Sequence, residues 1–202
     1  MNCSCLNNFN EEKEYEIVKE TIKQNKNLKS NQFDKVNPID EDIKSYLYKG
    51  TNYLCFDCGS NNVMYINYIM GVFLCTNCAS YHKELFNDSK SKRIKTIRDK
   101  CNDIESNILK EGGNSKLYSY LKFYNKNLSN EVFEINSIKS KYLNKAMEYY
   151  VEKLHCKSKN KKFNKFTPNK ITGLEIISKS QLISAIGTKE SIIEKFKNII
   201  TL

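Results

Sequence analysis

The sequence predicts an α+β fold in which a small sheet, built around four cysteines, packs against several α-helices. Three observations predict it. Residues 55–78, the four-cysteine segment, read CFDCGSNNVMYINYIMGVFLCTNC and contain two Cys-x-x-Cys pairs separated by sixteen residues. Between the pairs, VMYINYIMGVFL is apolar and β-branched enough for two short strands that turn near Gly71. From residue 103 onward, apolar residues recur at the spacing of amphipathic helices.

The part of the chain before residue 100 divides by its composition. Residues 1–42 are polar and predict a weakly helical N-terminal extension, with Cys3 and Cys5 in a frayed terminus rather than in a metal site. IKSYLYKG then predicts a short helix that ends at Gly50. After the two strands, TNCASYHKELF predicts a helix that begins inside the second Cys pair. SKRIKTIR alternates basic and apolar residues, as a half-exposed strand does.

The second half of the chain predicts a helical body. One helix is expected from Asp103 to Lys110, where Gly112 and Gly113 stop it, and another from Ser137 to about Leu154. Between them, Asn114 is expected to cap a third helix. The core face of that third helix is expected to consist of Leu117, Tyr118 and Leu121.

Two segments follow the domain expected over residues 43–152. Residues 153–170 carry seven lysines and no acidic residue, which suits a solvated linker or an arm that attracts anions. Residues 171–202 place apolar side chains, among them Leu182 and Ile186, on one face, and predict an amphipathic helical segment that docks on the rest of the chain. Because the opposite side is rich in Ser and Thr, a helix lying on a membrane surface is the alternative.

The bulk composition limits the class of protein and of partner. The 202 residues give room for one core with flanking segments. A net charge of +10 favours an anionic partner, which can be a nucleic acid, an anionic membrane face or a nucleotide-bearing protein. No apolar run is long enough to predict a transmembrane helix. Since the N-terminus lacks the pattern of an export signal, the eight cysteines are expected in a reducing compartment, where paired Cys-x-x-Cys motifs indicate metal or redox chemistry.

The four-cysteine segment predicts one structural zinc ion held by Cys55, Cys58, Cys75 and Cys78. Four thiolates surround Zn²⁺ as a tetrahedron, and each Cys-x-x-Cys turn presents two sulfurs from one side. Such a site has no open coordination position, so the binding energy of the metal supports the fold rather than a reaction. A redox site is disfavoured because no βαβ pattern surrounds either pair. His82 follows four residues after Cys78 and is expected to pack beside the site, with a ligand role as the alternative.

Four ordered motifs resemble those of one family. The Cys-x2-Cys-x16-Cys-x2-Cys spacing is similar to that of the GTPase-activating domain of Arf-family GTPases (the ArfGAP domain). GVFLCTNCASYHKEL resembles the family's second Cys pair with its His-Arg-x-Leu segment, and KRIKTI its following basic strand. GGNSKLYSYL resembles its Gly-Asn helix start, and IKSKYLNKAM its Lys-Tyr-x-x-Lys segment. The resemblance spans about residues 43–152 and is closest to the branch that carries Phe-Gly repeats elsewhere, although this chain has none.

The resemblance implies a regulator of GTP hydrolysis rather than an enzyme with a substrate of its own. Its partner would be an Arf-family small GTPase in the GTP form, in vesicle traffic, with the protein cytoplasmic and peripheral on Golgi or vesicle membranes. The family's catalytic arginine finger, five residues after the last zinc cysteine, falls on Lys83. Because an ammonium lacks the planar fork of a guanidinium, we expect weakened activation. Lys92, Arg93 and Lys95 would contact the GTPase, with a merely solvated strand face as the alternative.

Two further positions depart from the family pattern, since Tyr65 stands where the family commonly has Trp and Phe86 where it often has Gly. The sequence leaves two alternative functions open. One is an Arf-binding or scaffold protein in which Lys83 no longer supports catalysis. The other is a DNA-binding zinc finger of the GATA type, which is disfavoured because the linker is one residue short of its usual pattern and the chain contains no Trp. No nucleic-acid partner is therefore expected.

Overall fold

The computed structural model describes residues 38–86, 92–124 and 135–186, with side-chain surroundings from residue 139 onward in the last range. The chain divides into two units, Met1–Pro38 and Ile39–Leu202, and every element described below belongs to the second. Residues 1–37 of the predicted N-terminal extension, with Cys3 and Cys5, lie outside the described residues. Within the described ranges, no helix is both long and apolar enough to cross a bilayer.

A three-stranded antiparallel sheet forms within and just after the four-cysteine segment, in the strand order β2-β1-β3. The predicted hairpin is present, and its turn contains Gly71 with a φ of +68°, a left-handed conformation that glycine adopts without strain. A Cβ at Gly71 would lie 3.2 Å from the carbonyl oxygen of Ile108, so this turn packs against a helix backbone at close range. The strands are β1 Val63–Asn67, β2 Val72–Cys75 and β3 Ile94–Thr96.

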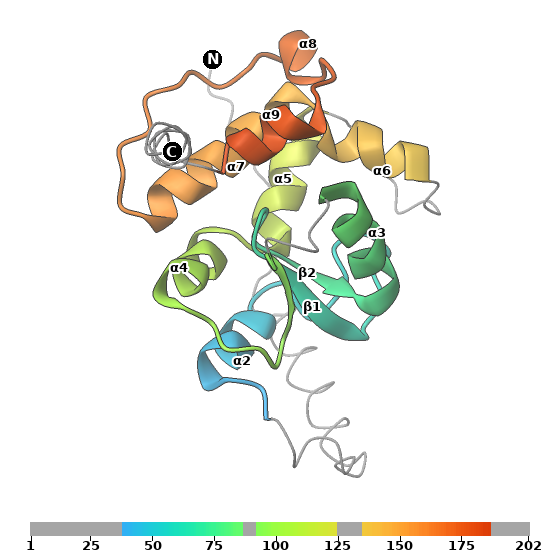
Figure 1. Ribbon diagram of the computed structural model, residues 1–202, viewed down its shortest axis with the longest axis vertical. Coiled ribbons are helices and arrows are strands. Elements are labelled where there is room, and N and C mark those ends of the chain that lie inside the picture. The colour runs from blue at the N-terminus through green and yellow to red at the C-terminus, as the bar shows by residue number, and fades with distance from the viewer. Residues whose placement is uncertain (1–37, 87–91, 125–134, 187–202) are drawn as a thin grey trace, which may run out of the picture. The chain divides into compact units, whose positions relative to one another are not determined.

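The helices before residue 125 follow the predicted order (Figure 1). The one carrying Asn102 at its N-cap begins with a capping box, in which the side chains of Asn102 and Glu105 each accept a hydrogen bond from the other's backbone N–H. The helix after β2 begins inside the second Cys pair, as predicted. The four helices are α2 Glu41–Leu47, α3 Thr76–Phe86, α4 Asp103–Glu111 and α5 Asn114–Tyr124.

The capping role predicted for Asn114 is wrong. Asn114 is the first residue of α5, and its buried side chain binds the backbone of segments far away in the sequence. Its Oδ1 accepts from the N–H of Phe73 at 2.9 Å, and its Nδ2 donates to the carbonyl of Leu54 at 2.7 Å. Asn114 thus ties α5 to β2 and to the chain that enters the four-cysteine segment. Of the predicted core face, Leu117 and Leu121 are buried but Tyr118 is exposed, and Tyr124, which was not predicted, is buried as well.

The single helix predicted from Ser137 to about Leu154 is in fact two helices, α6 (Ile135–Tyr142) and α7 (Lys145–Ser158). The break lies at Asn144, whose side chain accepts from a backbone N–H in the first turn of α7 at 2.9 Å. Asparagine is a strong N-cap because its side-chain oxygen satisfies a helix N–H that has no backbone partner. The apolar pattern runs on through the break, so periodicity alone does not reveal it.

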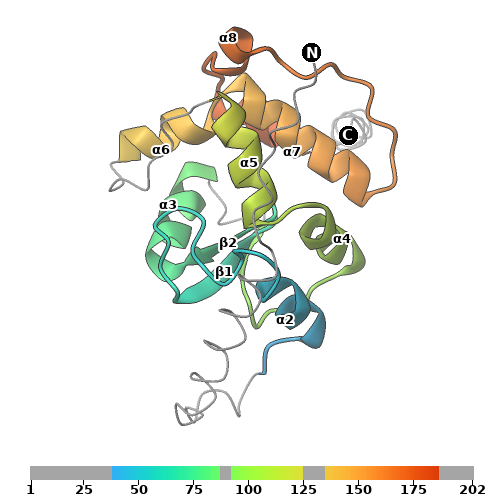
Figure 2. The same ribbon diagram turned by 180° about the vertical axis from the view of Figure 1, so that it is seen from behind.

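The C-terminal described segment packs on this helical body. α8 (Lys170–Gly173) contacts α5 and α7, and α9 (Lys179–Ser184) contacts α7 and α3. Figures 1 and 2 show α5 running from the sheet to α7, with α8 and α9 beside α7. Leu182 and Ile186 are buried, which agrees with docking rather than with a helix lying on a membrane. Residues 187–202 of the predicted segment lie outside the described residues.

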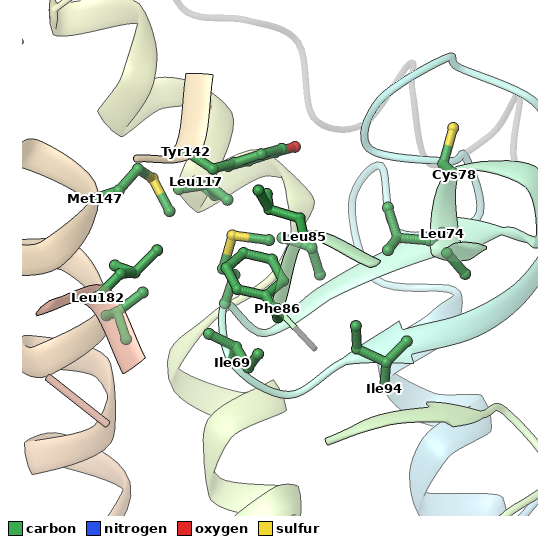
Figure 3. Packing of buried hydrophobic residues seen from close by; sticks show 14 of the residues in the cluster. Ile69, Leu74, Cys78, Leu85, Phe86, Ile94, Leu117, Tyr142, Met147 and Leu182 are labelled. Carbon is green, nitrogen blue, oxygen red and sulfur yellow. The ribbon is translucent and has the colours of Figure 1, made fainter. Parts of the chain in front are cut away.

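Two clusters of buried apolar side chains hold the described elements together. In the larger one, Leu85 and Phe86 of α3 lie between the sheet and the side chains of Met147 and Leu182 (Figure 3). The smaller cluster contains Ile66 of β1 and side chains of α2 and α4. Because neighbouring strand residues point to opposite faces, the two clusters cover the two faces of the sheet. α3 is therefore packed on both the sheet and the C-terminal helices.

The predicted fold class is confirmed, since a small sheet, several helices and four neighbouring cysteines make up the structure. The domain boundaries stay predictions. α2 begins at Glu41, before the boundary predicted after residue 42. α7 continues across the boundary predicted after residue 152, and α8 crosses the one after residue 170.

Candidate functional site

The four predicted metal ligands come together in the structure. The sulfur atoms of Cys55, Cys58, Cys75 and Cys78 all lie within 4.8 Å of one another, and those of Cys58 and Cys75 are 3.6 Å apart. A tetrahedron with Zn–S bonds of about 2.3 Å has edges of about 3.8 Å, whereas a disulfide requires about 2.05 Å. The spacing therefore fits one Zn²⁺ and not a pair of disulfides.

The surroundings of the cluster shift the pKa values of the Cys55 and Cys58 thiols in different directions. A hydrogen bond from Cys78 lowers the pKa of the Cys55 thiol to about 5, although burial acts against it. Burial raises the pKa of the Cys58 thiol to about 11. Zinc binds the thiolate form of cysteine, so binding of the metal would release the remaining thiol protons. A bound Zn²⁺ would supply a structural crosslink with no open coordination position.

Between the first two cysteines, Asp57 connects the four-cysteine segment to two helices. Its buried carboxylate accepts from His82 Nε2 of α3 at 2.7 Å and from Lys141 Nζ of α6 at 2.9 Å. The hydroxyl of Tyr142 donates to the same carboxylate oxygen as Lys141. The remaining ring nitrogen of His82, Nδ1, accepts from the side-chain amide of Asn67 in β1 at 2.9 Å. The network therefore joins α3, α6 and the sheet through one carboxylate.

The charge of Asp57 is stabilised where it lies. Burial alone would raise the pKa of its carboxyl, but its three partners His82, Lys141 and Tyr142 hold that pKa well below its usual range. Burial beside Asp57 raises the pKa of Tyr142, so its hydroxyl stays protonated and donates. A buried carboxylate with three donors is satisfied, and removal of one partner would leave an uncompensated group.

Lys83 follows His82 on α3 and is exposed, as a residue that reaches a partner must be. Its ammonium lies 4.2 Å from the centroid of the Tyr65 ring in β1. The ring thus supports the lysine on the protein surface through a cation–π contact. Phe86, one turn further along α3, is buried and packs against the His82 ring, which explains a large side chain where the family often has Gly.

The three basic residues predicted to contact a partner lie on or just before the edge strand β3. Lys92 is exposed, and Arg93 is half-buried. Lys95 pairs with Glu105 of α4 at 2.6 Å, on the face of the sheet opposite α3. Their role as partner contacts stays a prediction, and Lys95 would have to leave Glu105 to fulfil it.

His82 lies beside the metal cluster rather than in it, since the group of close metal-binding side chains in the described residues consists of the four cysteines. Sequence reasoning missed Asp57, Asn67, Lys141 and Tyr142. A signal for three of them was present, because Asp57 is the only acidic residue of the four-cysteine segment and Lys141 and Tyr142 form the Lys-Tyr motif. What no pattern indicated is that these residues meet.

Comparison with known families gives one match to a family model. The model of the ArfGap family, described as "Putative GTPase activating protein for Arf", matches residues 40–174, which is about two thirds of the chain. The matched range contains the four-cysteine segment, Lys83 and the helices up to α8. It therefore favours the ArfGAP prediction over a DNA-binding finger.

Curated relatives agree with this match. The chain is 31% identical over 129 residues to ADP-ribosylation factor GTPase-activating protein GCS1 of Saccharomyces cerevisiae, covering 62% of this chain and 35% of that protein. It is 29% identical over 104 residues to ADP-ribosylation factor GTPase-activating protein 3 of Pongo abelii, covering 52% and 19%. Uncharacterized protein F07F6.4 of Caenorhabditis elegans is 27% identical over 114 residues, covering 55% and 20%. The chain thus spans between a fifth and about a third of the length of these relatives.

Proposed function

Because the chain belongs to the ArfGap family, we propose that it stimulates GTP hydrolysis by an Arf-family small GTPase in its GTP form. The protein would then regulate a reaction whose substrate and catalytic water are bound by its partner. The single observation that carries the proposal is the placement of Lys83. Its exposed ammonium belongs to α3, and Asp57 of the four-cysteine segment holds this helix through a hydrogen bond with His82.

The geometry supports a positioning mechanism. Hydrolysis of GTP develops negative charge on the transferred phosphoryl group, and a cation held nearby stabilises that charge. Such a cation acts only if it needs little reorganisation on binding. His82, next to Lys83, is fixed by Asp57 and Asn67, so the backbone that carries the lysine is held in place. The Tyr65 ring holds the ammonium at the surface until the phosphate competes for it.

The residue type sets the expected strength of the effect. A guanidinium bridges two phosphate oxygens with a planar fork, while an ammonium offers a compact and strongly hydrated point charge. We therefore propose that Lys83 stimulates hydrolysis less than an arginine at the same position would. The full gain of an arginine finger is about 10³–10⁵ in rate.

Single-turnover GTP hydrolysis by a soluble Arf protein tests the proposal, with the wild-type chain, Lys83→Ala and Lys83→Arg. We expect the order Lys83→Arg, then wild type, then Lys83→Ala, with at least about tenfold between the last two. Lys110→Ala, which changes an exposed lysine of α4, serves as the charge-matched control for catalysis. Failure of all three proteins to bind GTP-loaded Arf would refute the proposal.

A second candidate function is an Arf-binding or scaffold protein without activating power. The observation that favours it is the Lys83–Tyr65 contact, in which the ammonium already has an aromatic partner within the chain. In that case wild type and Lys83→Ala would hydrolyse GTP equally slowly, while Lys83→Arg would be fast and all three would bind Arf.

The cellular setting belongs to the same proposal. We place the protein in the cytoplasm, in vesicle traffic, and peripherally on Golgi or vesicle membranes. The net charge of +10 supports contact with an anionic membrane face. Fractionation of cells that express the tagged chain, with Golgi and endoplasmic-reticulum markers, tests this setting, and recovery with neither cytosol nor Golgi membranes would contradict it.

A further inference from the structure

The segment from Phe166 through α8 is attached to the helical body by contacts with tyrosines of α5 and α7. The hydroxyl of Thr167 donates to the hydroxyl of Tyr149 at 2.9 Å. The hydroxyl of Tyr124 donates to the carbonyl of Pro168, also at 2.9 Å. Gly173 lies directly on the Tyr124 ring, since a Cβ there would come within 2.3 Å of that ring. These contacts fix which side of the segment faces inward.

The same segment turns large apolar side chains outward. Phe166 is 97% exposed, Ile171 is 83% exposed and Leu174 is 47% exposed. Phe166 and Ile171 are five residues apart, so their Cα atoms lie at most about 18 Å from each other. Burial of such side chains is worth roughly 25 cal/mol per Å² of apolar surface, so a partner that covers this anchored segment would gain free energy from each of them. We call Phe166, Ile171 and Leu174, with Lys162, Lys165 and Lys170, the α8 surface.

The charge around the α8 surface is mainly positive, although Glu152 pairs with Lys165 and Glu175 follows Leu174. Between Glu152 and Glu175 the sequence contains seven lysines and no acidic residue. Lys162, Lys165 and Lys170 are exposed. Lys165 pairs with Glu152 at 2.5 Å, and Lys170 lies over the Phe123 ring at 5.0 Å, so both side chains lie against the protein with their charge at the surface. The apolar side chains therefore project through a positively charged surface.

We propose that the α8 surface binds an anionic lipid bilayer, inserting Phe166 and Ile171 among the headgroups while the lysines contact lipid phosphates and carboxylates. The proposal rests on the proposed function, because it supplies the membrane contact of an Arf regulator. Lysine is depleted in protein–protein interfaces, whereas at membranes its stem lies along apolar groups and its charge reaches the headgroups. Single apolar side chains separated by polar residues also suit a fluid surface better than a protein groove.

The placement of the surface is compatible with action on a GTPase. α8 packs on α5 and α7, whereas Lys83 lies on α3. Contact with lipid through α8 therefore leaves the Lys83 ammonium and the Tyr65 ring to a partner. Membrane attachment would raise the local concentration of the chain near a partner on the same membrane without changing the chemistry at Lys83.

Flotation of the full-length chain with lipid vesicles tests the proposal. Wild type is expected to float with vesicles of phosphatidylcholine and phosphatidylserine, and at least about tenfold less with pure phosphatidylcholine or in high salt. The double substitution Phe166→Ser and Ile171→Ser is expected to lower the partition coefficient at least about tenfold. Lys162→Gln is expected to lower it about fivefold.

The double substitution Ile104→Ser and Tyr118→Ser is the matched control, since both residues are exposed apolar side chains outside the α8 surface. It should float like wild type. Wild type that does not float, or a Phe166/Ile171 variant that floats like wild type, would overturn the proposal.

A parallel assay with soluble Arf and no vesicles separates the two proposals. The Phe166/Ile171 variant should stimulate hydrolysis as wild type does. Loss of stimulation in solution by this variant, with flotation unchanged, would identify the α8 surface as a protein-binding face and refute the lipid assignment. Wild type that floats but neither binds nor stimulates Arf would refute the proposed function and leave lipid binding standing.

Discussion

His82 donates a hydrogen bond from Nε2 to Asp57, at 2.7 Å, and both side chains are completely buried. One residue belongs to the loop between two predicted zinc ligands, and the other stands immediately before Lys83. The contact therefore transmits the rigidity of the metal centre to the helix that carries the proposed catalytic cation. Its removal should affect stability in a way that can be measured.

Asp57→Asn should lower the free energy of unfolding by about 3 kcal/mol. The substitution removes the charge that compensates Lys141 and places an amide against donors that need an acceptor. Urea denaturation of the zinc-loaded protein measures the loss. Glu175→Gln is the control, because the Lys145–Glu175 pair is half-exposed and should contribute less than about 1 kcal/mol. Equal losses in the two variants would contradict a structural role for the network.

Cys78→Ser should abolish stoichiometric zinc binding and cooperative unfolding together. Zinc contributes about 10–16 kcal/mol in small Cys-rich sites, which equals or exceeds the total stability of an ordinary domain. Metal analysis and circular dichroism during titration with a chelator measure both properties. Cys156→Ser is the matched control, since Cys156 is a half-buried thiol outside the cluster. A folded Cys78→Ser protein with the wild-type melting temperature would rule out a structural metal.

His155 should make stability depend on pH below neutrality. Burial lowers its pKa from 6.5 to about 4, and its Nε2 hydrogen-bonds the carbonyl of Ile69 at 3.0 Å. The pKa of His155 is lower in the folded state than in the unfolded state. Its contribution to the free energy of unfolding is therefore complete above about pH 6.5 and is lost as the pH falls toward 4. The difference between the unfolded and folded pKa values, 6.5 − 4 = 2.5, corresponds to a loss of about 3 kcal/mol in the free energy of unfolding.

His155→Gln keeps a donor for the Ile69 carbonyl and does not titrate. Unfolding free energies of both proteins, measured from about pH 7.5 to 4.5 in excess zinc, should converge or cross as the wild type loses stability faster. Zinc release in acid affects both proteins and cancels in the difference. A difference that stays constant over this range would show that His155 titrates normally.

Leu182→Ala should lower the free energy of unfolding by about 2–4 kcal/mol, because Leu182 is fully buried among side chains of the larger cluster. Its neighbour Ile183 is partly exposed, and Ile183→Ala should change stability by less than about 1 kcal/mol. Thermal or urea unfolding of the two variants makes the comparison. Similar values for both would mean that α9 does not belong to the cooperative unit.

Much of the fold follows from local chemistry that the sequence displays. The Cys-x-x-Cys pairs, the turn at Gly71 and the helix start at Thr76 depend on residues that act within a few positions of one another. Contacts between residues far apart in the sequence do not follow from such local chemistry. Asn114 has the side chain of a helix cap, but it binds Phe73 and Leu54 instead, and only the folded arrangement determines that choice.

The candidate site also contains residues that the sequence predicts and residues whose contacts only the folded structure shows. Spacing along the chain predicts the four cysteine ligands, whereas the role of Lys83 is implied only by the family resemblance. The partners of Asp57 come from residues 82, 141 and 142 and depend on how α6 meets α3. The break at Asn144 was missed for a related reason, because one hydrogen-bonding side chain overrides an apolar period that continues on both sides of it.

The packing of α3 against α9 has a consequence for synthesis on the ribosome. Leu182 covers Leu85 and Phe86, but it enters the chain about a hundred residues after them. At a synthesis rate of roughly 5–20 residues per second, the apolar side of the helix that carries Lys83 would stay uncovered for about 5–20 s, until Leu182 has been added. Zinc captured early by the nascent chain would hold this helix in place during that interval, so metal supply would govern the yield of folded protein before it governs stability.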